Sequence, residues 1–235
     1  LSIIPKDRKR SYEMRDIVKL VFDKDSFFEM TKFFGKGIIT GFARINGFPV
    51  AIFANDSNFY AGSRSAEGAQ KTSRFIRLCD TFRIPIVSLV DEPGFLIGPD
   101  AERAGTILHG TEAVLATTES KVPWSTIMIR KSFGVAAAAH YGPDGYVLAW
   151  PSAESGPLPL EGGVAVAFKK EIASAKNPEA KRKELEEKMA KNQSPFPRAE
   201  AFSVHEIIDP RETRKYIALW AERIQSQLKA SLMNR

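Results

Sequence analysis

The sequence is poor in the residues that build cross-links and metal sites, with one cysteine and three histidines among 235 residues. The lone Cys79 excludes an internal disulfide, and its place in an amphipathic helical pattern predicts a buried structural thiol. The histidines His109, His140 and His205 lie far apart without the spacing of metal ligands. We therefore expect structural histidines and no metal site.

Long apolar runs and side-chain nucleophile motifs are also missing. No window reaches the roughly 18 apolar residues of a membrane span, so we expect a soluble, cytoplasmic protein without membrane contacts. No Walker loop, zinc cluster or G-x-S-x-G serine occurs, which excludes the chemistry that those motifs support. The first residue is leucine, which is compatible with one domain of a longer polypeptide.

The net charge of +6, with a pI of about 9.4, raises the question of a polyanionic partner. Segment 169–188 mixes both signs on a helical pattern, which is typical of a solvated helix face. No aromatic-basic platform or nucleic-acid-reading motif accompanies the charge, so we expect no nucleic-acid binding. A phosphate-bearing metabolite or an acidic partner protein accounts for the excess equally well.

Helical and strand periodicities alternate along the chain, which predicts an α/β fold. The strongest local signal is Asn46-Gly47 between two apolar runs, because both positions tolerate positive φ in a hairpin turn. Segment 25–29 is expected to form a short turn, and Asp209-Pro210 to begin a C-terminal helix that reaches about Leu232. The other expected helices span 14–22, 65–82, 105–116 and 161 onward, and the expected strands span 38–45, 48–54, 84–90, 122–129, 147–151 and 203–208.

The strand expected at 84–90 runs into a rigid turn, Pro93-Gly94-Phe95. Ligands bind at the carboxyl ends of strands in open α/β sheets, so this turn is a candidate binding element. Asp91 and Glu92, just before it, point to opposite faces of an extended strand, which argues against a shared acid/base pair. An ordinary strand-ending turn is the alternative.

A second turn follows the strand that begins near residue 122. Gly134 permits a backbone turn that a larger residue would strain, and small helix formers follow it. Val135 and Ala136 then offer backbone amides at the start of a helix, where they can hold a developing oxyanion. The alternative is a helix that merely begins after a strand.

Short segments over nearly the whole chain form an ordered series: 11–16, 41–50, 54–55, 71–75, 77–82, 84–85, 90–96, 109–110, 122–123, 129–134, 149–154, 161–162 and 207–214. With VDEPGFL at 90–96 and IRKSFG at 129–134, the series resembles the C-terminal half of biotin-dependent acyl-CoA carboxylase carboxyltransferases, as in propionyl-CoA carboxylase β subunits. The resemblance implies a crotonase-like ββα superhelix. It also implies that 1–235 is a carboxyltransferase C-terminal domain, with a lead-in at 1–35 and a core with a C-terminal helix at 36–235.

The resemblance further implies carboxyl transfer from carboxybiotin to the α-carbon of an acyl-CoA. Biotin would be carried on a biotin carboxyl carrier or biotin carboxylase partner, and an N-terminal carboxyltransferase domain would bind coenzyme A. The active site would lie at a dimer interface, so a homo-oligomer is expected. Matched position by position, the amides that stabilise the biotin enolate fall on Val135 and Ala136 after Gly134, and Pro93, Gly94 and Phe95 line the same pocket.

This chain departs from the family pattern at a few positions. Val135 stands where the family usually has glycine, Ile97 stands where it has proline, and 155–160 differs from the usual run. The position that tunes acyl specificity falls on Ala138, which is smaller than usual and implies a roomier or atypical acyl group. Two alternatives stay open: a biotin-dependent acyl-CoA decarboxylase that uses the same pocket in reverse, and a non-catalytic assembly subunit.

Overall fold

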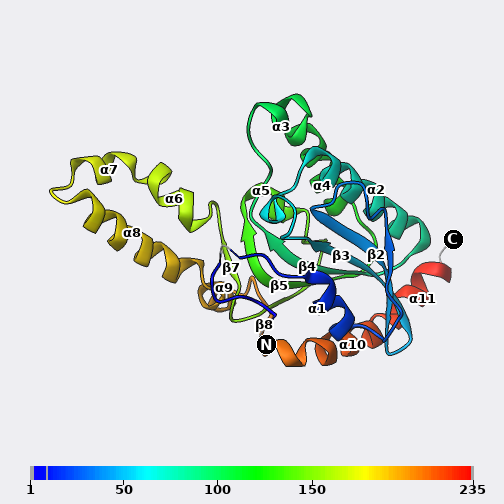
Figure 1. Cartoon of the computed structure of the whole chain (residues 1–235). Coiled ribbons are helices and arrows are strands. Elements are labelled where there is room, and N and C mark those ends of the chain that lie inside the picture. The colour runs from blue at the N-terminus through cyan, green and yellow to red at the C-terminus, as the bar shows by residue number, and fades with distance from the viewer. Residues whose placement is uncertain (1–2, 9, 234–235) are drawn as a thin grey trace.

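The computed structural model describes residues 3–8 and 10–233, and one mixed β-sheet forms its centre (Figure 1). The strands lie in the order β1-β2-β3-β4-β5-β6-β8, and β7 pairs with the carboxyl end of β5. The pairs β1–β2 and β2–β3 are antiparallel, whereas the other pairs are parallel. The strands are β1 Phe28–Met30, β2 Ile38–Ile45, β3 Phe48–Asn55, β4 Ile86–Glu92, β5 Trp124–Phe133, β6 Tyr146–Ala149, β7 Glu154–Gly156 and β8 Glu206–Ile207.

Helices cover both faces of this sheet (Figure 1). Helices α2 and α4 pack over one face, and α1 and α10 pack over the other. A third group, α6 to α8, extends away from the sheet as an arm. The helices are α1 Met14–Val21, α2 Ala66–Phe82, α3 Pro99–Arg103, α4 Thr106–Thr118, α5 Gly134–Ala138, α6 Leu160–Ala167, α7 Lys169–Ser174, α8 Pro178–Gln193, α9 Pro195–Glu200, α10 Thr213–Arg223 and α11 Gln225–Met233, with short 3-10 turns η1 Tyr60–Gly62 and η2 Pro210–Glu212.

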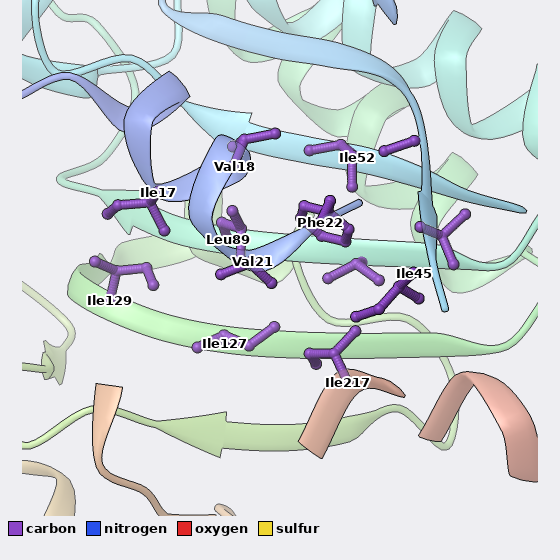
Figure 2. Packing of buried hydrophobic residues seen from close by; sticks show 14 of the residues in the cluster. Ile17, Val18, Val21, Phe22, Ile45, Ile52, Leu89, Ile127, Ile129 and Ile217 are labelled. Carbon is purple, nitrogen blue, oxygen red and sulfur yellow. The ribbon is translucent and has the colours of Figure 1, made fainter. Parts of the chain in front are cut away.

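Successive residues of the central strands point to opposite faces, which gives the protein two apolar layers. In β3, Ile52 packs on the side of α1 and α10, whereas Phe53 packs on the side of α2. Figure 2 shows the first layer, in which Ile17 of α1 and Ile217 of α10 face the sheet. Because both faces are covered, the central strands read as continuous apolar runs in the sequence.

The predicted hairpin is confirmed. Strands β2 and β3 pair from Ile45 opposite Phe48 onward, and Asn46 and Gly47 between them have φ values of 49° and 82°. The Asp23 carboxylate accepts hydrogen bonds from both turn amides, at 3.0 and 2.8 Å. Arg214 of α10 lies 2.7 Å from Asp23 and so ties the C-terminal helix to this turn.

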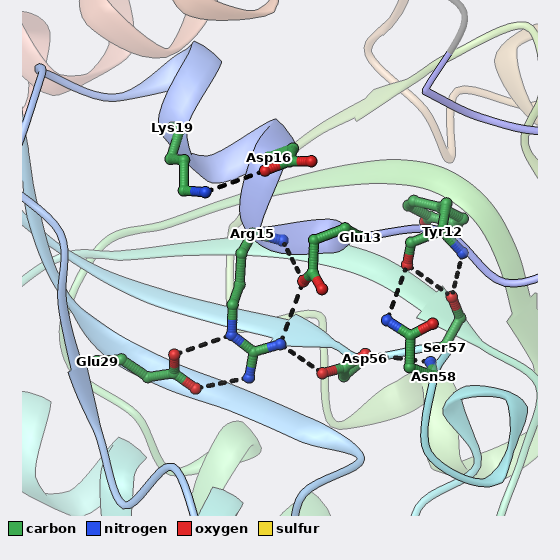
Figure 3. A network of polar contacts seen from close by, with 9 residues as sticks. All are labelled: Tyr12, Glu13, Arg15, Asp16, Lys19, Glu29, Asp56, Ser57 and Asn58. Carbon is green, nitrogen blue, oxygen red and sulfur yellow. Dashed lines mark hydrogen bonds and ion pairs between the residues drawn. The ribbon is translucent and has the colours of Figure 1, made fainter.

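The lead-in is held against the sheet by polar contacts near the carboxyl end of β3 (Figure 3). Arg15 of α1 forms ion pairs with Glu29 of β1 at 2.7 Å and with Asp56 at 2.5 Å. The Tyr12 amide donates to Ser57 Oγ at 3.1 Å, and this hydroxyl lies 3.2 Å from the Tyr12 carbonyl oxygen. The segment from Tyr12 to Glu29 is therefore part of the packed domain.

Two predicted segments were wrong. Part of the turn expected at 25–29 forms β1, because Phe28–Met30 pair with the free edge of β2 opposite Phe42 to Thr40. Three residues are too few for an alternating pattern to be recognised in the sequence. The C-terminal segment begins as predicted, with Asp209 capping and Pro210 at the first position, but the single helix expected is η2 followed by α10 and α11, which are separated at Ile224, a residue buried in the core.

Other predictions are confirmed, with shifted boundaries. The strand expected at 84–90 is β4, two residues further on, and the strand expected at 122–129 continues to Phe133. Cys79 is buried in α2, and burial raises the pKa of its thiol. Most of the charged helix α8 is exposed, as its mixed charges indicate. Within 3–8 and 10–233, no helix is both long and apolar enough for a membrane span.

Candidate active site

The two glycine turns predicted as site elements lie at the same edge of the sheet. Strands β4 and β5 are parallel neighbours, and Glu92 at the end of β4 pairs in register with Ser132 near the end of β5. Pro93-Gly94-Phe95 therefore leaves the sheet beside the point where Gly134 begins α5. This edge is the carboxyl edge, where ligands bind in α/β sheets.

The turn 93–95 is held by backbone hydrogen bonds on both sides. The Arg64 amide donates to the Gly94 carbonyl at 3.0 Å, and the Leu96 amide donates to the Arg64 carbonyl at 2.9 Å. Gly94 has a φ of 134°, and a Cβ atom there would meet nothing within 4 Å. The turn is thus fixed in place while its Gly94 side faces open space.

The Phe95 ring packs directly on α4. A Cβ atom built on Gly110 would overlap this ring, so glycine is required at that position for the ring to reach the helix backbone. Phe95 is half-buried there, and it also bridges to Arg64 in a short parallel pairing. Both the aromatic ring and the backbone of this turn therefore have fixed positions.

The second turn depends on a left-handed glycine. Gly134 has a φ of 62°, a left-handed conformation whose conformational energy is low for glycine and higher for a residue with a side chain. The first amides of a helix lack partners within it, so α5 presents donors beginning at this turn. Val135 is 69% exposed and Ala138 is also exposed, whereas Ala136 is completely buried. The Pro157 carbonyl would lie 3.4 Å from a Cβ on Gly134, so the connection after β7 runs close beside it.

Asp91 and Glu92 point to opposite faces, as predicted, and each has an arginine partner. Asp91 accepts from Arg130 Nε at 3.2 Å and Nη2 at 2.9 Å, on the α1 side of the sheet. Glu92 Oε2 lies 2.8 Å from Arg64 Nη2, on the opposite face. Both carboxylates are completely buried, so neither is placed to act as an acid or base at the surface.

The charge states around Glu92 follow from burial and from its partners. Burial raises the pKa of Glu92, but the charge of Arg64, the nearby His140 ring and a hydrogen bond from Asn55 outweigh it, so the pKa lies below its usual value. Burial lowers the pKa of His140 to about 4, which leaves the imidazole neutral at pH 7. Ser88 Oγ lies 2.8 Å from His140 Nδ1, and His140 Nε2 lies 3.5 Å from Glu92 Oε2.

The buried polar cluster behind the turns was not predicted from the sequence. Asn55, Arg64 and His140 come from three separate segments, and only the parallel sheet brings them to Glu92. The adjacent acids at a buried strand end were the available signal, because buried carboxylates need cationic or hydrogen-bonding partners. In the described part of the chain no group of three or more histidine, cysteine or acidic side chains could hold a metal ion.

Two cavities in the described part of the chain lie away from these turns. One, of about 770 Å³, lies between the lead-in, α1 and the segment after β6. Another, of about 510 Å³, lies at the opposite edge of the sheet, beside Trp124 and α10. The turns 93–95 and 134–136 line neither of them.

Comparisons with known proteins identify the family. Residues 1–234 match the carboxyl transferase domain. The propionyl-CoA carboxylase carboxyltransferase subunit of Haloferax mediterranei is 37% identical over 233 residues, which cover 97% of this chain and 45% of that protein. The methylmalonyl-CoA decarboxylase subunit alpha of Propionigenium modestum is 36% identical over 92% of this chain and 43% of its own length.

A solved structure supports the same assignment. The transcarboxylase 12S hexamer, with methylmalonyl-CoA and methylmalonic acid bound, superposes with a TM-score of 0.90 at 36% identity. That match covers 95% of this chain and 44% of the 12S chain, so the chain spans less than half the length of these relatives. The predicted crotonase-like α/β fold is confirmed. The chain belongs to the carboxyl transferase domain family.

Proposed function

We propose that residues 1–235 form the C-terminal, biotin-side domain of a biotin-dependent acyl-CoA carboxylase carboxyltransferase, with 1–35 as its lead-in. The reaction is carboxyl transfer from carboxybiotin on a partner protein to the α-carbon of an acyl-CoA. One observation carries the proposal: Gly134, at φ 62°, turns β5 into α5 beside the turn 93–95, so helix-start amides and a fixed aromatic turn share one edge.

The residues at this edge fit the biotin ring system. Carboxybiotin, when bound, supplies the carboxyl group and leaves negative charge on its ureido oxygen. We assign the two donors from the family pattern, with the Val135 amide first and the Ala136 amide second; residue Val135 is exposed in this chain, whereas residue Ala136 is buried. Removing one such donor typically costs about a hundred- to a thousandfold in rate. Pro93, Gly94 and Phe95 form the wall beside the ring, and Gly94 leaves open space for it.

The other components of the reaction come from outside this chain. We assign coenzyme A binding to an N-terminal carboxyltransferase domain, which fits the relatives of about twice this length. Biotin arrives on a biotin carboxyl carrier or biotin carboxylase subunit. Assembly into a homo-oligomer completes the site, as the hexamer of the 12S relative suggests. Ala138 is exposed at the same edge, and its small side chain favours an acyl group larger than propionyl.

Carboxyl transfer can be tested with free carboxylated biotin and acyl-CoAs of increasing chain length. The protein is assayed alone and together with an N-terminal carboxyltransferase domain. Transfer only with both parts supports the proposal and identifies the preferred acyl group. Absence of transfer in both cases, together with no biotin binding, contradicts it and leaves the assembly-subunit alternative.

A decarboxylase is the second candidate, favoured by the relative from Propionigenium modestum, which is named as a methylmalonyl-CoA decarboxylase subunit. The same amides would act in this direction, since they stabilise the same charge. The reconstituted protein is therefore also given the carboxylated acyl-CoA with free biotin. A decarboxylation rate that exceeds the carboxylation rate with every partner subunit would favour this candidate over the first.

A further inference from the structure

Arg64 is a buried charge directly behind the candidate site. It lies between η1 and the first turn of α2, and its side chain is completely buried. Burial of a charge is costly unless it is paired, so such a residue is expected to have a specific partner. The partners of Arg64 are the residues that shape the turn 93–95.

Arg64 contacts this turn through both its backbone and its side chain. Its amide and carbonyl groups bond to Gly94 and Leu96 on the two sides of Phe95. Its Nε donates to Glu92 Oε2 at 3.0 Å, while Glu92 Oε1 accepts from the Gly94 amide at 3.2 Å. Arg64 therefore contacts the residue before the turn, the middle of the turn and the residue after it.

Glu92 continues this connection toward α5. Its Oε2 lies 3.5 Å from Nε2 of His140, which follows α5 by two residues. The His140 carbonyl accepts from Thr126 Oγ1 at 2.7 Å, and the His140 amide donates to Ala137 at 2.9 Å. The Phe53 ring contacts both residues. Its centroid lies 4.4 Å from the centroid of the stacked His140 ring and 5.5 Å from the Arg64 guanidinium carbon.

We propose that Arg64 is a positioning residue that sets the turn 93–95 against α5 through Glu92 and His140. The effect on carboxyl transfer rests on the proposed function, whereas the mechanical link between the turn and α5 does not. Arginine suits this role because its planar fork fixes a direction toward the carboxylate, which the point charge of lysine cannot do. Among the described residues, the Arg64 side chain pairs with Glu92 and not with α5. The link therefore predicts that a change at Arg64 reaches α5 indirectly.

Hydrogen exchange tests the link without using activity. Arg64→Lys is expected to increase exchange of the Leu96 amide and also of the amides of 139–141, by about tenfold. Arg214→Lys is the control, because Arg214 pairs with Asp23 at the opposite end of the domain. Faster exchange at Leu96 alone, with 139–141 unchanged, would overturn the proposed link.

Kinetics of the reconstituted full-length carboxyltransferase test the role in the reaction. Arg64→Lys is expected to lower kcat about tenfold and to raise the KM for free biotin, with the KM for acyl-CoA unchanged. Arg64→Met leaves Glu92 without its charge partner, so it is expected to lower kcat more than Arg64→Lys does. If Arg64→Lys has the kcat and biotin KM of the wild type and melts at the temperature of the control, Arg64 has only a structural role and the proposal is overturned.

A milder variant covers the case in which the arginine variants do not fold. Ser88→Ala removes the hydroxyl that fixes His140 Nδ1 and frees the ring to turn away from Glu92. It is expected to increase exchange at both 139–141 and Leu96, and no increase at Leu96 contradicts the link. If wild-type protein transfers no carboxyl group, the proposed function fails, while the exchange results still decide the link.

Discussion

His140 shows how a single residue at the carboxyl edge is held in one charge state by its surroundings. It is completely buried, is stacked on Phe53 and is hydrogen-bonded to Ser88. Its neutral form is favoured because the charged form would lose its hydration. The same burial leaves Glu92 ionised only because Arg64 and its other partners compensate. Stability should therefore depend on pH through this cluster.

Stability is expected to fall as the pH falls from 6.5 to 4. In this window the unfolded chain binds a proton on His140, whereas the folded chain, with a pKa of about 4, does not. The free energy of unfolding is expected to fall by an amount on the order of 3 kcal/mol over the whole window. Urea unfolding at each pH measures it, and His140→Gln should flatten the profile. His205→Gln, an exposed histidine, should retain the wild-type slope, and an equal flattening in this control contradicts the assignment.

Helix α4 shows how an element can fix a turn of the candidate site without supplying a polar group. Its Gly110 lets the Phe95 ring approach the helix backbone, so the turn 93–95 is fixed against α4 as well as against Arg64. Glycine in a helix interior is otherwise unfavourable by about 1 kcal/mol relative to alanine. Close packing at this one position therefore offsets a local helix penalty.

Two helix glycines are expected to respond oppositely to alanine. Gly110→Ala should displace the Phe95 ring, lower stability by about 1–3 kcal/mol and weaken biotin binding. Gly162→Ala in α6 meets nothing within 4 Å and should raise stability by up to about 1 kcal/mol. Thermal unfolding and biotin titration of both variants measure this. If Gly110→Ala binds biotin normally, Phe95 does not form part of the biotin pocket.

Elements with strong local signals were predictable from the sequence, and those fixed by distant pairing were not. The hairpin at Asn46-Gly47 follows from turn chemistry, and the helix at 65–82 follows from its helical apolar pattern. The structure adds a cap to this helix, because Ser65 Oγ accepts from the Gly68 amide. Strand β1 has only three residues and exists because β2 offers an edge. At the candidate site, the glycine turns were predictable from neighbouring residues in the sequence. The pair Arg64–Glu92 was not, because its residues are 28 positions apart.

On the scale of the whole molecule, the sheet domain and the arm differ in how they are stabilised. The sheet has apolar layers on both faces. In the arm, α8 has Leu185 and Gln193 as its described buried residues, and α7 has none. Local unfolding free energies follow such differences in burial.

The arm is therefore expected to open without unfolding of the sheet. Amide exchange in α7 and α8 should be faster than in β3, β4 and β5 and should depend little on urea at low concentration. Hydrogen exchange resolved by peptide measures both regions in the same sample. Equal protection of the arm and the sheet, lost together at one urea concentration, would contradict this expectation.

The most direct test of the central claim compares two substitutions at Val135 in the reconstituted transfer reaction. Val135→Pro removes the backbone donor at a first-turn position that tolerates proline, whereas Val135→Gly retains the donor and removes the side chain. If the α5 amides stabilise the charge on biotin, Val135→Pro should lower kcat about a hundred- to a thousandfold, and Val135→Gly should stay near wild type. Equal activity of folded Val135→Pro and Val135→Gly would contradict the account.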